Sequence, residues 1–248
     1  MQSTLRAHLS EAPFTLAMSS GFFGFFAHAG MLAALEEAGV TPSRIGGSSA
    51  GALVAGLWAS GRSARELGEE LAALRRADFW DPGLGLGLLK GRKFDDKVRA
   101  TLGAQRFEDC RVPCFTSVYD VVRRRVTVER HGELAPAIVA SCAVPGLFQP
   151  VMRDGRVLVD GGVADRPGLL GVGAGERVLF HHLASRSPWR GASSMQIPSR
   201  QGMTALVIRG LPRLGPFRLE HGPTAFARAK AATARALGGP VAPVIWAG

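Results

Sequence analysis

The sequence of 248 residues predicts an α/β fold, a three-layer α/β/α sandwich in which helices cover a mainly parallel central sheet. Three observations predict it. Short buried apolar runs alternate with segments of helical periodicity, and the first two of these runs each lead through glycines into a helix. In addition, 46% of the residues are hydrophobic, and no linker-like segment divides the chain. A chain of this length can bury a large core, so a single domain over residues 1–248 is expected.

The first quarter of the chain predicts the order strand, loop, helix, strand, turn, helix. Phe14–Met18 is an apolar run that stops at Ser-Ser-Gly, which is typical of a buried strand. Residues 27–38 carry apolar side chains at helical spacing, and Gly39 follows where a helix-ending glycine belongs. A short strand at Ile45 then leads through glycines into a helix over residues 50–60. This order is that of a right-handed α/β unit.

The rest of the chain predicts further strands and helices joined by irregular segments. Residues 80–91, with the letters WDPGLGLGLLKG, are expected to be irregular because glycine recurs through them. Two of the expected strands, 115–121 and 125–129, lie close enough in sequence to pair as a hairpin. Helices are expected over residues 64–76, 135–142 and 224–237, and strands over 115–121, 125–129, 157–159, 178–183 and 205–208.

The chain carries a formal net charge of +10, largely from arginine, including the run Arg123–Arg125. Basic charge attracts nucleic acids and anionic lipid surfaces alike. Aromatic and basic residues are not interleaved as in nucleic-acid readers, so no nucleic-acid partner is expected. The basic residues therefore form either an ordinary solvated surface or a peripheral contact with an anionic membrane.

Three cysteines, Cys110, Cys114 and Cys142, show neither the spacing of a zinc site nor a disulfide framework. We expect structural thiols and a reducing, cytoplasmic location. The uncharged run Phe14–Leu35 is nominally long enough to span a bilayer, but serines, glycines and a histidine interrupt it. We interpret the run as two buried elements joined by a tight loop.

One serine is framed by glycines in the stretch Gly47-Ser48-Ser49-Ala50-Gly51. A serine hydroxyl attacks an ester only with a base in reach and with donors aimed at the oxyanion that forms. A sharp strand-to-helix turn provides that geometry, and flanking glycines allow close approach of neighbouring backbone. Ser49 is therefore the candidate nucleophile, with Gly47 and Gly51 shaping its turn. The alternative is a seam of small residues where a helix packs on a sheet.

The base is either a histidine or a carboxylate. In the α/β-hydrolase arrangement a histidine follows the serine, and His181, His182 and His221 satisfy that order. The nucleophile of that fold usually follows several strands, however, whereas only one precedes Ser49 here. Asp160 ends a short apolar segment and is followed by two glycines, which leave room for its carboxylate to approach another turn. An ordinary turn aspartate is the alternative interpretation.

Four blocks of the sequence resemble the patatin-like phospholipases in order and spacing, covering most of residues 14–170. This resemblance implies a serine acyl hydrolase with a Ser–Asp dyad, no catalytic histidine, no cofactor and no metal. It assigns Ser49 as the nucleophile and Asp160 as its base. The blocks are AHAGMLAALEEAGV (27–40), GGSSAGALVAGLWASG (46–61), ASCAVPGLFQPV (140–151) and LVDGGVADRPGL (158–169).

The resemblance also implies an oxyanion loop after the first strand, and here the sequence departs from the family. The matching segment is SSGFFG, residues 19–24, in which two glycines have become serine and a basic position has become Phe23. Backbone N–H groups survive such changes, so an oxyanion hole from Ser20, Gly21 and Phe22 is expected.

The family substrate is a phospholipid or another fatty-acyl ester, so a lipid is the expected partner. The phenylalanines at 22, 23, 25 and 26 either line an acyl-chain pocket or pack in the core. Two other functions stay open: a histidine-dependent hydrolase, and a lipid- or partner-binding module that has lost catalysis. The headgroup, the acyl length and the oligomeric state are not set by the sequence.

Overall fold

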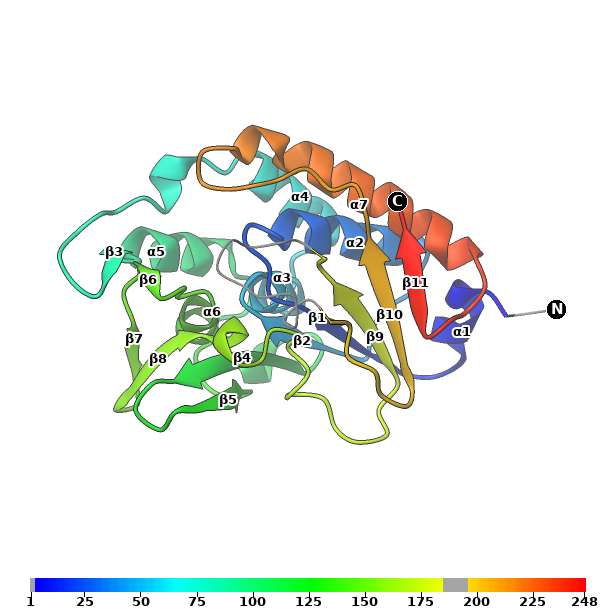
Figure 1. The fold of residues 1–248 in the computed structure, drawn as a ribbon, viewed down its shortest axis with the longest axis horizontal. Helices are drawn as coiled ribbons and strands as arrows, with labels where there is room; N and C mark the ends of the chain where they lie inside the picture. The colour runs from blue at the N-terminus through cyan, green and yellow to red at the C-terminus, as the bar shows by residue number, and fades with distance from the viewer. Residues whose placement is uncertain (1–2, 185–195) are drawn as a thin grey trace.

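The computed structural model describes residues 3–184 and 196–248. Its centre is a nine-stranded sheet with the order β11-β10-β9-β1-β2-β4-β8-β7, in which β5 pairs with β4 outside this path (Figure 1). The strands are β1 (Thr15–Met18), β2 (Arg44–Ser48), β4 (Cys114–Asp120), β5 (Arg125–Glu129), β7 (Val151–Arg153), β8 (Arg156–Asp160), β9 (Val178–His182), β10 (Met203–Ile208) and β11 (Val244–Ala247).

The strands from β11 to β4 run parallel, and the antiparallel pairs gather at one side of the sheet. There β5 and β8 both pair with β4, and β7 pairs with β8. The hairpin predicted from residues 115–129 is confirmed. The predicted α/β fold is also confirmed, with a mixed, mainly parallel sheet at its centre.

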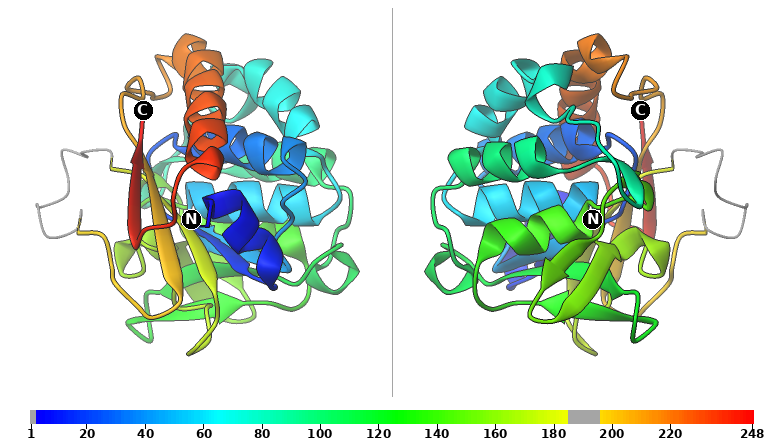
Figure 2. Two further views of the ribbon diagram at one scale, coloured as in Figure 1. Left: turned by 90° about the vertical axis from the view of Figure 1, so that its right-hand side faces the viewer. Right: turned by 90° about the vertical axis from the view of Figure 1, so that its left-hand side faces the viewer.

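The two layers that cover the sheet are unequal. All seven helices named below contribute buried side chains to one large core cluster, and the helices lie together on one side of the sheet (Figure 2). The other face buries a smaller cluster around Phe180, covered by Leu169 and Val172 of the irregular segment that follows Asp160. The helices are α1 (Leu5–Glu11), α2 (Phe25–Glu37), α3 (Ala50–Ala59), α4 (Ala64–Ala72), α5 (Arg92–Thr101), α6 (Leu134–Ser141) and α7 (Gly222–Gly238).

The long uncharged run near the N-terminus forms strand β1, a loop over residues 19–24 and helix α2. It is apolar because α2 is almost wholly buried, lying against α7, α3 and α4. Gly30 marks the closest approach: a Cβ there would lie 2.2 Å from the carbonyl oxygen of Phe226 in α7. The interpretation of two buried elements is confirmed. Within the described residues, no helix combines the length and apolar character needed to cross a bilayer.

Several boundaries differ from those expected. Helix α2 begins two residues early, at Phe25, while α4 ends at Ala72 instead of Arg76. The glycine-rich segment expected to be irregular contains strand β3 (Gly87–Leu89), which pairs with β6 (Gly146–Phe148) in a second small sheet. Five further elements were not expected from the sequence, because they are short or carry few apolar residues: α1, α5, β6, β7 and β11.

Strand β4 positions the candidate site because two strands share one of its edges. Thr116 of β4 is paired with Gly47 of β2 on one side and with Glu129 of β5 on the other. Two residues further along, Val118 is paired with β5 again, and on the opposite side with Asp160 of β8. Since a strand has only two edges, β2 and β8 lie on the same edge. They run in opposite directions, so their carboxyl ends meet head to head.

Candidate active site

The residue that follows β2 occupies a strained turn. Ser49 has φ 54° and ψ −118°, a backbone conformation that residues other than glycine rarely adopt. Helix α3 begins at the next residue. Both flanking glycines face the last carbonyl of β1. A Cβ on Gly47 or on Gly51 would lie 2.2 Å from the oxygen of Met18. The glycine frame is therefore required by the close approach of β1, and the strain at Ser49 points to a functional turn.

The head-to-head arrangement brings the two residues predicted as a dyad into contact. The Ser49 hydroxyl donates to Oδ2 of Asp160 at 2.6 Å, and both side chains are buried. The other carboxylate oxygen, Oδ1, accepts the N–H of Gly162 at 2.7 Å, within the 3-10 turn η3 (Gly161–Val163). The glycines after Asp160 thus orient its carboxylate. A carboxylate held in this way can accept the hydroxyl proton as the serine attacks.

Ser141, the last residue of α6, and Cys142, which follows it, hold the backbone of Ser49 in place, and neither role was expected from the sequence. The Ser141 hydroxyl accepts the N–H of Ser49 at 2.9 Å and donates to the carbonyl of Ser117 in β4 at 2.7 Å. The thiol of Cys142 donates to the carbonyl of Ser49 at 3.3 Å. Burial, with the nearby charge of Asp160, raises the pKa of Cys142 well above its ordinary value, so the thiol stays protonated. Both residues lie in the block ASCAVPG, and this block was the sequence feature that could have indicated their roles.

The loop after β1 offers backbone donors beside this pair. The N–H of Ser20 donates to the carbonyl of Arg166 at 2.8 Å, so this group is not available to an oxyanion while that bond is made. The N–H groups of Gly21 and Phe22 make no hydrogen bond to any described residue. The two remaining glycines of the loop lie against Leu183: a Cβ on Gly21 or Gly24 would lie 2.5 or 2.1 Å from Cδ1 of that side chain, which would have to change rotamer.

The four phenylalanines expected at an acyl pocket or in the core divide between the two environments. Phe26 is buried beneath the start of α7, and Phe25 packs against the main core. Phe23, with φ 55°, contacts the ring of Phe79, and Phe22 is half-exposed. The pocket hypothesis therefore remains for Phe22 and Phe23, whereas Phe26 has the core role.

The histidines of the described chain do not hydrogen-bond to Ser49. His221 lies at the start of α7 with its side chain exposed, beside Glu220. His181 pairs through Nδ1 with Nδ1 of His28 at 2.8 Å, and Nε2 of His28 lies 2.8 Å from the carbonyl oxygen of Ser19. A carbonyl only accepts, so His28 donates through Nε2 and its Nδ1 accepts from His181. This buried pair fixes the carbonyl at the start of the oxyanion loop.

The buried histidine pair predicts a loss of stability in mild acid. Burial lowers the pKa of His28 to about 4 from 6.5, so below pH 6.5 the unfolded chain binds a proton that the folded chain refuses. For His28 alone, stability is full above pH 6.5 and falls as the pH drops toward 4, by about 2 kcal/mol between pH 7 and pH 5. Burial also lowers the pKa of His181, which adds to the loss in the same direction. Urea unfolding of the protein at these two pH values measures this loss. His28→Gln is expected to shrink it, while the exposed control His131→Gln keeps it; an equal loss in both variants contradicts the prediction.

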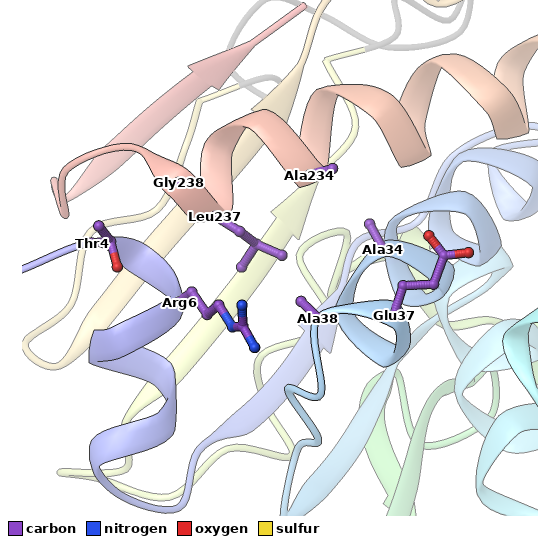
Figure 3. Close-up of a pocket in the computed structure, with 8 residues that line it drawn as sticks. All are labelled: Thr4, Arg6, Ala34, Glu37, Ala38, Ala234, Leu237 and Gly238. Carbon is purple, nitrogen blue, oxygen red and sulfur yellow. The ribbon is translucent and has the colours of Figure 1, made fainter.

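A pocket of about 380 Å³ lies elsewhere, between α1, α2 and the end of α7 (Figure 3). Its charged side chains are Arg6 and Glu37. Since α2 begins beside the oxyanion loop and ends at this pocket, the pocket is a helix length away from the dyad. Among the residues that the structure describes, no three His, Cys, Asp or Glu side chains are grouped as metal ligands. The hydrogen-bonded pair Ser49 and Asp160 is the candidate catalytic site.

Comparison with known proteins identifies related chains. An uncharacterized NTE family protein from Mycobacterium tuberculosis is 34% identical over 167 residues, covering 66% of this chain and 46% of that protein. The neuropathy target esterase sws of Drosophila persimilis is 32% identical over 154 residues, covering 57% of this chain and 11% of that protein. This chain thus spans less than half the length of these relatives.

Two solved structures share the fold. VipD from Legionella pneumophila superposes with a TM-score of 0.67 at 13% identity, covering 91% of this chain and 66% of that chain. The type III effector ExoU of Pseudomonas aeruginosa has a TM-score of 0.52 at 17% identity, covering 91% and 52%. The family profile of patatin-like phospholipases matches residues 16–171, which include the strained turn and Asp160. Because this match covers more than half of the chain, the protein belongs to the patatin-like phospholipase family.

Proposed function

We propose that the protein is a serine acyl hydrolase that cleaves fatty-acyl esters of lipids, with Ser49 as nucleophile and Asp160 as base. One observation carries the proposal: the 2.6 Å hydrogen bond between these side chains, made from a strained turn at the start of a helix. Family membership and the word esterase in a relative's name support the ester chemistry. Phe22 and Phe23 supply apolar surface beside the loop for an acyl chain.

The reaction follows from the geometry in two steps. Ser49 Oγ attacks the ester carbonyl while Asp160 Oδ2 accepts the hydroxyl proton, and the N–H groups of Gly21 and Phe22 bind the oxyanion. The tetrahedral intermediate collapses, the alcohol leaves with the proton from Asp160, and an acyl-serine remains. Water then attacks this ester, again giving a proton to Asp160. The fatty acid leaves as Ser49 takes the proton back.

A fluorophosphonate probe tests the nucleophile directly. The folded protein is expected to form a covalent adduct on Ser49, visible by mass spectrometry of the digested chain, and Ser49→Ala is expected to form none. The neighbouring Ser48 is the matched control: its hydroxyl is buried and has no described hydrogen-bond partner, so Ser48→Ala should label like the wild type. An unlabelled Ser49, or labelling that persists in Ser49→Ala, overturns the assignment.

A substrate panel separates the lipid classes. Phospholipid, lysophospholipid, triacylglycerol and acyl thioester substrates are compared with a short p-nitrophenyl ester, using released fatty acid or nitrophenol as the readout. We expect a long-chain lipid ester to give the highest kcat/KM, because its acyl chain buries apolar surface beside Phe22. Activity on the short ester alone excludes a lipid hydrolase, and probe labelling without turnover of any substrate favours the binding-module alternative.

A further inference from the structure

One surface loop exposes leucines in a row. The leucine loop, residues 82–88 with the letters PGLGLGL, places a leucine at every second position. Leu84 is 100% exposed, Leu86 is 82% exposed and Leu88 is half-exposed. Neighbouring apolar side chains left in water are uncommon on a soluble surface unless something covers them in function.

The loop is braced in this conformation. The side-chain amide of Gln149 donates to the carbonyl of Leu84 at 2.7 Å, and the N–H of Gly83 donates to the carbonyl of Leu88 at 3.1 Å. Strand β3, which ends the loop, pairs with β6, and a Cβ on Gly87 would lie 2.3 Å from the Phe148 backbone. The leucines are thus presented outward by the surrounding contacts.

An apolar path connects the loop with the candidate active site. Trp80, just before the loop, packs edge-on against the exposed ring of Phe217 at 5.7 Å. Two residues before Phe217, Gly215 lies beside the half-exposed Phe22 of the oxyanion loop. Phe79, next to Trp80, contacts Phe23 of the same loop at 5.9 Å. These contacts link the leucine loop to Phe22 and Phe23 of the predicted oxyanion loop.

Positive charge surrounds these apolar residues. Two nearby carboxylates accept backbone hydrogen bonds: Asp78 accepts the N–H of Arg75, and Asp81 accepts the N–H groups of Gly91 and Lys93. Within residues 82–93 there is no aspartate or glutamate. The exposed cations of residues 75–93 and 213–218 are Arg75, Arg76, Lys90, Arg92, Lys93, Arg213 and Arg218.

We infer that the leucine loop inserts into the surface of an anionic bilayer while the surrounding cations contact lipid phosphates, so that the predicted oxyanion loop beside Ser49 faces the membrane. Leucines enter the acyl region, and basic side chains next to them remain at the headgroups. The inference rests on the proposed function for its choice of lipid as partner. A thin loop suits a bilayer, which has no shape to match, better than a protein partner, which needs a broad buried area.

Vesicle co-sedimentation tests this surface. Ser49→Ala protein, which leaves the lipid intact, is titrated with vesicles of phosphatidylcholine and phosphatidylglycerol in a 7:3 ratio. We expect binding that weakens at least tenfold when Leu84→Ser and Leu86→Ser are added, because each leucine buried in lipid contributes about tenfold. Lys90→Gln with Arg92→Gln is expected to weaken binding by about tenfold at low salt and to reduce its salt dependence in part, since five of the seven exposed cations remain.

The matched control is Val122→Ser with Met152→Ser, which removes apolar side chains of similar exposure, 72% and 69%, from the region of the Arg123–Arg125 hairpin. This control is expected to bind as tightly as its parent. Three results overturn the inference: no binding by the parent, equal binding by the leucine variant, or an equal loss in the control. Gel filtration without lipid can give a fourth overturning result. A dimer that the leucine substitutions disrupt would show that a second copy of the chain, and not a bilayer, covers the leucine loop. Probe labelling of the wild-type Ser49 reports separately on the proposed function.

Discussion

Asp160→Asn is expected to reduce the rate of ester hydrolysis by about 10²–10⁴-fold while leaving the fold intact. Asparagine has the size of aspartate, and its amide oxygen can still accept the N–H of Gly162, as Oδ1 does now at 2.7 Å. It cannot accept the Ser49 proton, because a neutral amide has almost no basicity. The change therefore removes proton transfer from the 2.6 Å contact and leaves the packing around it.

The measurement is kcat/KM on a p-nitrophenyl ester, together with the rate of fluorophosphonate labelling and the unfolding midpoint. Asp154→Asn is the matched control, since Asp154 lies on the exposed turn just before β8 and has a positive φ that asparagine tolerates. The control should keep the wild-type rate. A variant at Asp160 that stays within tenfold of wild type, with an unchanged unfolding midpoint, contradicts the carboxylate base and returns attention to a histidine.

Gly51→Ala is expected to disrupt the turn that holds the nucleophile. The new Cβ would lie 2.2 Å from the oxygen of Met18 and 2.7 Å from its carbonyl carbon, and neither backbone atom can rotate away. Relief requires α3 or β1 to shift, which moves Ser49 from Asp160. We expect a loss of about 3 kcal/mol in the free energy of unfolding and at least about a hundredfold loss of activity.

Gly56→Ala provides the comparison within the same helix. Its Cβ would lie 2.4 Å from Cδ1 of Ile138, the end of a flexible side chain that can change rotamer. Replacing a helical glycine by alanine gains up to about 1 kcal/mol, which offsets part of the repacking. Urea unfolding and esterase assays of both variants separate the two sites. If Gly56→Ala is as damaging as Gly51→Ala, the contact with Met18 is not the cause.

The fold was predictable from the sequence where a residue pattern is typical of only one kind of element, a strand or a helix. The buried strands β1, β9 and β10 are short runs of mostly apolar residues, and α3 is a small apolar helix after a glycine turn. Helix α5 was missed because its sequence, RKFDDKVRAT, offers little apolar periodicity, and its single fully buried hydrophobic side chain is Val98. Three-residue strands such as β6 and β7 carry too few side chains to show an alternation.

For the candidate site, the sequence indicated Ser49 and Asp160 but not how they meet. Their proximity depends on which edge of β4 each strand takes, and no local pattern encodes that choice. The hydrogen bonds of the supporting groups are also long-range. Ser141 reaches Ser49 across 92 positions, and the N–H of Ser20 is occupied by a carbonyl from the segment after Asp160. Such pairings are properties of the assembled tertiary structure.

The shared edge of β4 has an evolutionary consequence. Strand β4 aligns Ser49 and Asp160, whereas the leucine loop lies outside this sheet, so we expect changes in the loop to leave the contact between the two side chains in place. If the loop binds lipid as inferred, evolution can change the membrane surface that it contacts while the contact between Ser49 and Asp160 is retained.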